Sequence, residues 1–220
     1  SAVDHPGDDA MPLHGLLGVL RESAAVSAFA AGAAAGRAKG ASLGDRADLM
    51  ADLRVSAPAG LWPFLLGALS ESLTDGGSPQ DGGTARPPPV VLAVTPTGRE
   101  AEDLADAMGA VLDPERVAVF PAWETLPHER LSPGSDTVGR RLAVQRRLAH
   151  PTEDFAGSGR LAVVVAPVRA LLQPFVPGLG EVSPLGLRAG DEHDFDAAVR
   201  QLAELGYERT DLVERRGQFA

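Results

Sequence analysis

The chain has 220 residues and carries 30 acidic against 20 basic side chains, so its formal net charge is −10. Hydrophobic residues make up 44% of the chain, which is enough for a packed core and excludes wholesale disorder. Cysteine is absent, which excludes disulfides, thiolate metal sites and cysteine nucleophiles.

The charge pattern also limits the class of partner. An acidic chain is a poor generic binder of nucleic acid or of a membrane surface. Lys39 is the only lysine, so nearly every basic side chain is an arginine, which is suited to planar, bidentate pairing at interfaces. The chain has no run of about 18 apolar residues, the length that predicts a transmembrane helix.

The N-terminal quarter predicts helices and no chemistry. Residues 1–15 have the composition of a polar tail. Alanine-rich sequence from Leu16 to about Ala38 favours helix, and Ser23 or Ser27 is placed to cap a second helix within it.

A strand, a turn and a helix are predicted next, over Asp52–Ala57, Pro58–Gly60 and Leu61–Leu73. This order is the setting of a phosphate-binding loop, which needs several glycines, a lysine and a hydroxyl. Ser56–Phe64 instead holds one glycine, no lysine and two prolines that remove backbone N–H donors. We therefore expect a structural turn here and no nucleotide binding.

Beyond a linker-like segment at 74–89, three apolar runs predict buried strands over Val90–Thr95, Arg116–Phe120 and Leu161–Ala166. Helices are predicted between and after them. Strands that alternate with helices at this spacing predict an α/β fold with a parallel sheet covered on both faces. The predicted helices are one that Thr97 and Glu100 open with a capping box, one over Thr137–Ala149 capped by Asp136, and one over Val168–Leu172.

Two groups of polar residues on these helices could contact a ligand. Thr97 and Arg99 follow the first strand, at the sheet edge where parallel α/β folds bind ligands, although a satisfied helix cap is the favoured explanation of this segment. The helix over 137–149 carries an arginine cluster that could be a solvated face, a docking surface for other parts of the chain, or a phosphate contact. Its members are Arg140, Arg141, Arg146 and Arg147.

After Gln173 prolines and glycines become frequent, and a second small unit follows. Asp194–Leu205 predicts an amphipathic helix with Gly206 as its C-cap. Tyr207–Val213 and Gly217–Ala220 predict strands of a hairpin or meander. Because the chain stops inside the last of these, we expect it to be part of a longer protein.

The C-terminal strands carry a second candidate surface. Arg209, Arg215 and Arg216 accompany Phe219, and arginine with an aromatic side chain on a strand is typical of a protein–protein hot spot. Charges that protect an exposed sheet edge are the alternative explanation. The five histidines are scattered without metal-ligand spacing, and no nucleophile–base set is present, so neither a metal site nor a catalytic site is predicted.

Four segments carry a family resemblance that covers roughly residues 50–220. They are Phe120–Glu129, Leu131–Thr137, Leu202–Tyr207 and Arg215–Phe219. Together they resemble the N-terminal, UvrB-like module of the bacterial transcription-repair coupling factors (Mfd).

The resemblance implies a fold and a division of the chain. Residues 1–50 would be an N-terminal tail with helices. Residues 51–173 would form a degenerate helicase-like domain 1A, of RecA-like (P-loop NTPase-like) architecture. Residues 174–220 would be the incomplete start of a small α+β insert, domain 2.

The resemblance also implies a function for the longer protein. It would be an ATP-driven translocase on double-stranded DNA, acting in the bacterial cytoplasm, with ATP and Mg²⁺ bound in a downstream motor. It would displace stalled RNA polymerase and recruit UvrA for nucleotide excision repair. The present chain would be a monomer that catalyses nothing, holds no cofactor or metal and contacts no membrane.

The UvrA-binding face of domain 2 would include Arg209 and Phe219, with Arg215 and Arg216 beside them. Two other hypotheses remain open. In one, the chain is a helicase remnant that contacts a nucleic-acid backbone through Thr97, Arg99 and the arginine cluster, with Arg140, Arg141 and Arg147 as the contact residues. In the other, the arginine helix packs on the downstream motor and inhibits it.

Overall fold

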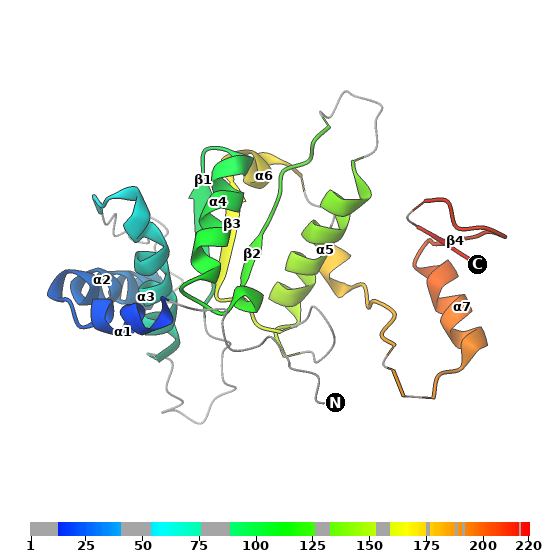
Figure 1. Cartoon of the computed structure of the whole chain (residues 1–220), viewed down its shortest axis with the longest axis horizontal. Helices are drawn as coiled ribbons and strands as arrows, with labels where there is room; N and C mark the ends of the chain where they lie inside the picture. The colour runs from blue at the N-terminus through cyan, green and yellow to red at the C-terminus, as the bar shows by residue number, and fades with distance from the viewer. Residues whose placement is uncertain are drawn as a thin grey trace, which may run out of the picture.

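A parallel three-stranded sheet lies at the centre of the larger part of the molecule (Figure 1). The computed structural model describes residues 13–40, 54–75, 89–125, 133–152, 159–174, 177–187, 189–190, 192–215 and 217–220. Strand β3 stands between β1 and β2, and Val163 is the register partner of both Val91 and Val117. The predicted parallel α/β arrangement is therefore confirmed. The strands are β1 (Val91–Thr95), β2 (Val117–Val119) and β3 (Val163–Pro167).

Helices α3 (Trp62–Asp75) and α4 (Gly98–Gly109) cover one face of the sheet (Figure 1). Val163 and Val165 of β3 point to this side and are fully buried, together with Met108 of α4. Short 3-10 turns lead into α3 and into β2, at Ala59–Leu61 and Pro114–Arg116. The alternating side chains of one apolar strand thus supply the core beneath α3 and α4.

Two N-terminal helices, α1 (His14–Arg21) and α2 (Ala24–Gly40), pack on the outer side of α3 (Figure 1). Leu17 of α1 is buried, and a Cβ at Gly67 of α3 would stand only 3.3 Å from its methyl carbon. A glycine at that position therefore allows the two helices to approach closely. Ser23 directly precedes α2, as the sequence predicts for a second helix.

Helices α5 (Ser135–Ala149) and α6 (Val168–Leu172) lie on the other face, over β2 and β3. Val164 and Ala166 of β3 are buried there. Leu92 and Val94 of β1 point to the same side and are each 51% exposed, because neither helix extends over the edge strand. The prediction that helices cover both faces is therefore wrong at β1.

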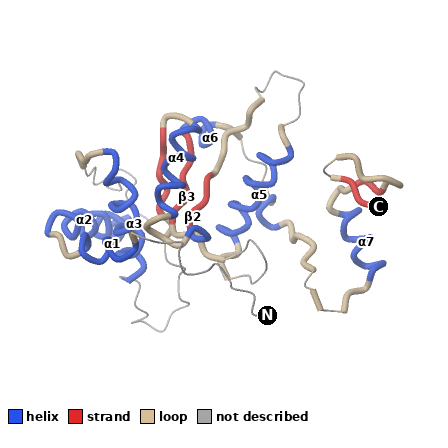
Figure 2. The backbone as a smooth tube through the Cα atoms, in the orientation of Figure 1, coloured by secondary structure: helices blue, strands red, loops and turns tan. Residues whose placement is uncertain are grey.

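A proline- and glycine-rich crossover leads to a small C-terminal unit at the end of the molecule opposite α1 and α2 (Figures 1 and 2). The crossover contains one 3-10 turn, Leu179–Glu181. The unit consists of α7 (Phe195–Glu204), which Asp194 caps, and two short strands, β4 (Glu208–Arg209) and β5 (Gln218–Phe219). Gly206 ends α7 with φ +86°, as predicted for a C-cap glycine.

Three local predictions are wrong. β4 and β5 pair in parallel, not as a hairpin, because the segment between them crosses back and re-enters at Gly217, with φ +86°. Residues 54–57 form no strand, while 52–53 lie outside the described residues. Gly134 precedes α5 and Asp136 lies in its first turn, so Asp136 is not the cap.

Candidate partner-binding surfaces

Arg209 and Phe219 are brought together by the parallel pairing of β4 and β5. They are ten residues apart in sequence and are direct register partners in the ladder. Partners in register point their side chains to the same face of a sheet. Backbone hydrogen bonds flank Arg209 on both sides, because the N–H of Glu208 donates to Gly217 O and the N–H of Thr210 donates to Phe219 O. An exposed guanidinium therefore stands beside a half-buried ring.

Arg215 belongs to the opposite face of the same ladder. Its guanidinium donates to a carboxylate oxygen of Glu208 at 3.1 Å, and the Gln218 amide donates to the same oxygen at 3.3 Å. These bonds, from Gln218 first and Arg215 second, lower the pKa of Glu208. Arg215 is thus tied to Glu208, on the side away from Arg209, whereas Arg216 lies outside the described residues.

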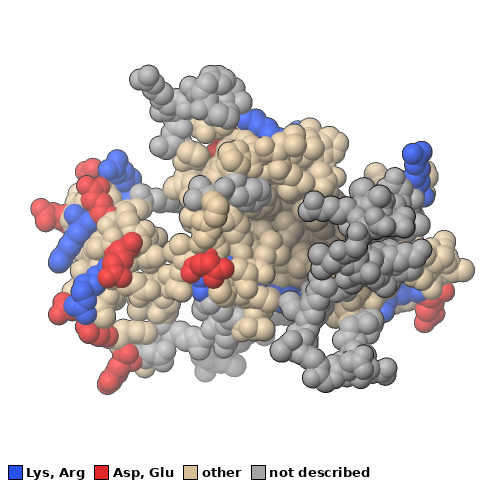
Figure 3. Space-filling view, turned by 180° about the vertical axis from the view of Figure 1, so that it is seen from behind, with Lys and Arg blue, Asp and Glu red and all other residues tan. Residues whose placement is uncertain are grey.

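The loop between β4 and β5 is held by its own polar groups. The side-chain oxygen of Gln218 accepts from the backbone N–H groups of Glu214 and Arg215, at 3.1 and 3.2 Å. Leu212 and Val213, at the outside of this loop, are mostly exposed. Figure 3 shows the molecule from behind: acidic and basic side chains intermingle over the end that holds the C-terminal unit, and the middle of the molecule is largely uncharged. The unit therefore presents a mixed surface of charge and apolar groups.

The N-terminus of α4 carries Thr97 and Arg99. The Thr97 hydroxyl accepts from the N–H of Glu100, and the Glu100 carboxylate accepts from the N–H of Thr97 at 3.0 Å, so the predicted capping box is confirmed. That carboxylate already occupies the position where a helix N-terminus attracts an anion. Arg99 projects into solvent, 91% exposed, with Asp103 at 3.9 Å.

Arg141 does not lie on a surface. Its side chain is 1% exposed and is stacked between the rings of Phe120 and Trp123, each 4.1 Å from the guanidinium carbon. It donates to Pro121 O at 2.6 Å, and burial lowers its pKa. The expectation that Arg141 is available to a partner is therefore wrong: it fastens residues 120–123 to α5.

The other arginines of α5 are also largely committed within the chain. Arg140 forms an ion pair with Glu102 of α4 at 2.8 Å, and both side chains are about half exposed. Arg147 donates to the carbonyl oxygens of Glu115 and Gly159, and burial lowers its pKa against the opposing effect of Glu115. Arg99 and Arg140 are thus the predicted contact arginines that retain substantial exposure on this domain.

Several known proteins are similar in sequence to this chain. No family model matches the chain. Proteins from Mycobacterium tuberculosis and Mycobacterium bovis are 57% identical to it over 130 residues, which is 59% of this chain and 10% of theirs. A protein from Escherichia coli is 31% identical over 133 residues, 60% of this chain and 11% of that protein. All three carry the name transcription-repair-coupling factor.

The matched segment is homologous to the transcription-repair-coupling factors. The family resemblance predicted from the sequence is thereby confirmed. The chain spans about a tenth of the length of the curated relatives that it matches.

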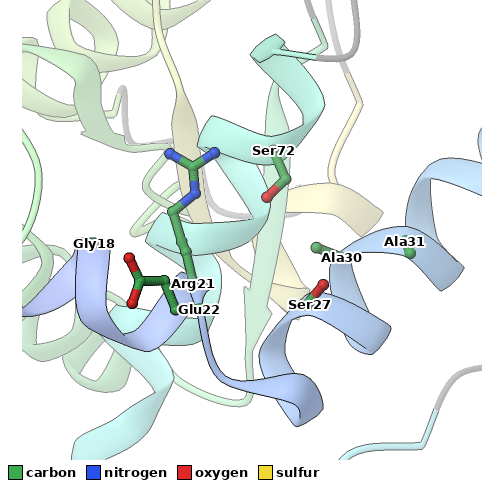
Figure 4. A pocket seen from close by; sticks show the side chains of 7 residues that line it. All are labelled: Gly18, Arg21, Glu22, Ser27, Ala30, Ala31 and Ser72. Carbon is green, nitrogen blue, oxygen red and sulfur yellow. The ribbon is translucent and has the colours of Figure 1, made fainter.

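The chain has an open hollow of about 560 Å³ between its N-terminal helices and α3. Figure 4 shows its lining: Arg21 from α1, serine and alanine side chains from α2, and Ser72 from α3. The Arg21 guanidinium donates to the Glu71 carboxylate at 3.1 Å, so the positive charge that Arg21 brings to this hollow is neutralised within the chain.

The described residues contain neither a metal-binding cluster nor a single membrane-spanning helix. That part of the chain has no group of three or more histidine or acidic side chains that could hold a metal ion. Within it, no single helix is long and apolar enough to cross a membrane, although the bent pair Gly15–Arg21 and Ala24–Ala33 reaches that length and composition together. Residues 54–61, which overlap the segment Ser56–Phe64 where a structural turn is expected, are exposed to half-buried and end in a 3-10 turn.

Sequence reasoning placed Arg146 in the arginine cluster without indicating its contacts, and it missed Gln173. Arg146 is buried and donates to Val182 O at 2.8 Å and to Gly180 O at 3.3 Å, which ties the crossover to α5. The Gln173 amide pairs with both backbone groups of Trp123, at 2.7 and 3.2 Å. Both contacts span more than 30 residues, so no local pattern could have indicated them.

Proposed function

We propose that this chain is the recruitment module of a transcription-coupled DNA repair factor. It binds UvrA and brings nucleotide excision repair to RNA polymerase stalled on DNA. It catalyses nothing itself. In the longer protein, a downstream motor would bind ATP and Mg²⁺ and translocate on double-stranded DNA.

The observation that carries the proposal is the pairing of Arg209 with Phe219 on one face of the β4–β5 ladder. Arginine and aromatic side chains dominate protein–protein hot spots, because a ring offers rigid apolar area and a guanidinium offers directed hydrogen bonds. Among the described residues, Arg209 forms no ion pair within the chain, unlike Arg215. A carboxylate of UvrA is therefore the partner group that we expect for Arg209.

The larger domain supports a non-catalytic role. A parallel sheet with helices on both sides is compatible with a helicase-like domain 1A. Ser56–Phe64 lacks the lysine and the glycines that hold phosphate, and two of its positions are prolines. This domain would act as the scaffold that carries the UvrA-binding unit.

The test is a charge reversal in the full-length protein. Arg209→Glu should weaken UvrA binding by about 2 kcal/mol, roughly 30-fold, as expected for a central interface arginine. ATP turnover should stay near normal. Arg200→Glu is the matched control, because Arg200 is an exposed arginine of α7 in the same unit. UvrA affinity that is unchanged by Arg209→Glu would contradict the assignment.

A backbone contact with nucleic acid is the second candidate, and the exposure of Arg99 favours it. A salt titration of DNA affinity separates the two functions, because phosphate contacts weaken steeply with added salt. DNA binding that is absent at low salt would remove this candidate. Autoinhibition through the arginine helix has less support, because Arg141 and Arg146 are buried.

A further inference from the structure

A hollow of about 490 Å³ separates α5 from the C-terminal unit. We call it the α5–α7 groove. Its lining is mostly apolar, and it comes from both sides of the gap. One wall is formed by Leu142 and Ala143 of α5 with Leu179 and Val182 of the crossover, and the other by Leu202, Leu205 and Tyr207.

Hydrogen bonds and close packing fasten the crossover to α5 on this wall. Arg146 is 8% exposed and reaches from α5 to three oxygens of the crossover, those of Gly180, Val182 and Ser183. A Cβ at Gly180 would stand 3.1 Å from the Gln145 carbonyl oxygen, a tight contact, so the absence of a side chain eases the close approach of the crossover to α5. The crossover up to Ser183 is therefore held in place on α5 by these contacts.

The opposite wall is an amphipathic helix without a core of its own. Val199 and Leu202 of α7 and its C-cap Leu205 recur at helical spacing, yet none of the ten residues of α7 is buried. Most helical stability in proteins comes from packing such a face against another element. The groove is the place where this face meets an apolar surface within the chain.

The connection between the two walls permits movement. Residues 184–187 and 192–194 form no helix or strand, and Gly190 has φ +94°. Nothing else in the chain that the structure describes links the unit covalently to the sheet domain. A change of backbone angles in this short stretch would bring the walls together or apart.

We propose that the α5 wall is the intramolecular docking surface of α7. The groove closes when Leu202 and Leu205 pack against Leu142 and Ala143, and the C-terminal unit then has a fixed orientation on the sheet domain. This contact does not depend on UvrA or on any other partner, so it stands apart from the proposed function.

Disulfide trapping tests the contact directly, since the chain contains no cysteine. The 220-residue chain with Leu142→Cys and Leu202→Cys is oxidised with copper phenanthroline, and the intrachain product is followed by non-reducing gel and mass. The control pair is Leu142→Cys with Arg200→Cys, because position 200 is two residues from 202 and faces away from it on the helix. The 142–202 pair should close at least tenfold faster.

A third variant checks that disulfide formation reflects the proposed apolar contact and not random encounters of the two cysteines. Leu205→Asp, added to the 142–202 pair, should slow closure to the control rate, because a carboxylate replaces an apolar side chain of the contact. Equal rates for the two pairs, interchain product as the main species, or closure unaffected by Leu205→Asp would overturn the proposal. Circular dichroism of each variant checks that the sheet domain is folded.

Discussion

The sheet domain and the C-terminal unit are held together by different means. In the sheet domain all five residues of β3 are buried, and two apolar clusters lie on either side of it. In the described residues from 192 to the end of the chain, no residue is buried, and the order comes from hydrogen bonds and turns. The first region stabilises itself by burial, and the second leaves its side chains available to other surfaces.

The largest effect should come from the core under α4. Met108 is completely buried, and Met108→Ala should lower the free energy of unfolding by about 2–5 kcal/mol, since it leaves a cavity. Leu212→Ala in the C-terminal loop is the control, with an expected change of within about 0.5 kcal/mol, because Leu212 is mostly exposed. Urea denaturation measures both. Equal losses would show that the two regions do not differ in packing.

The stacked arginine should come next. Arg141→Ala removes two ring contacts and the hydrogen bond to Pro121 O, and should cost about 2–3 kcal/mol of unfolding free energy. Arg140→Ala, one residue away, breaks an exposed ion pair and should cost at most about 1 kcal/mol. A cost for Arg140→Ala that matches or exceeds that for Arg141→Ala would refute the structural role given to Arg141.

Removing a helix N-cap should have a different effect on stability in each of the two regions. Thr97→Ala removes the capping box of α4 and should lower global stability by about 1 kcal/mol. Asp194→Ala removes the corresponding cap of α7, whose carboxylate accepts from two N–H groups. It should speed amide exchange in α7 alone and leave the denaturation midpoint of the sheet domain unchanged. A shift of that midpoint would mean that the regions unfold as one.

The smallest effect concerns pH. The hydrogen bond donated by Thr137 is the main cause that lowers the pKa of Glu124. A carboxyl whose pKa is depressed by folding stabilises the fold above its unfolded-state pKa, and this contribution disappears as the pH falls through the folded-state pKa. Thr137→Val should raise the Glu124 pKa and weaken the acid dependence of stability. An NMR titration that finds the same pKa in both proteins would contradict this.

Local features such as helix caps were predictable from the sequence, whereas contacts between residues far apart in the sequence were not. The capping box follows from the four consecutive residues that begin at Thr97 and end at Glu100. The C-cap follows from a single glycine, Gly206, after an amphipathic helix. The burial of Arg141 requires Phe120 and Trp123 to reach α5 from about 20 residues away, and nothing in an arginine-rich helix indicates which arginine faces inwards.

The C-terminal site was predicted in part. The choice of Arg209 and Phe219 rested on residue type and on a family resemblance, and the structure makes these two residues neighbours. The parallel pairing that does so depends on Gly217 and on the Gln218 side chain that holds the loop, so the expected hairpin was wrong. Arg215 was grouped with Arg209 by composition alone, and its hydrogen bond to Glu208 ties it to the other face.

Hydrogen exchange of the 220-residue chain, alone and with purified UvrA, tests the central claim most directly. Without UvrA, amides of β3 should exchange slowly and those of residues 195–219 much faster. With UvrA, we predict slower exchange in peptides that cover Glu208–Phe219 and no change around Thr97–Asp103 or in α5. Protection confined to α4 or α5, with residues 208–219 unaffected, would contradict the account.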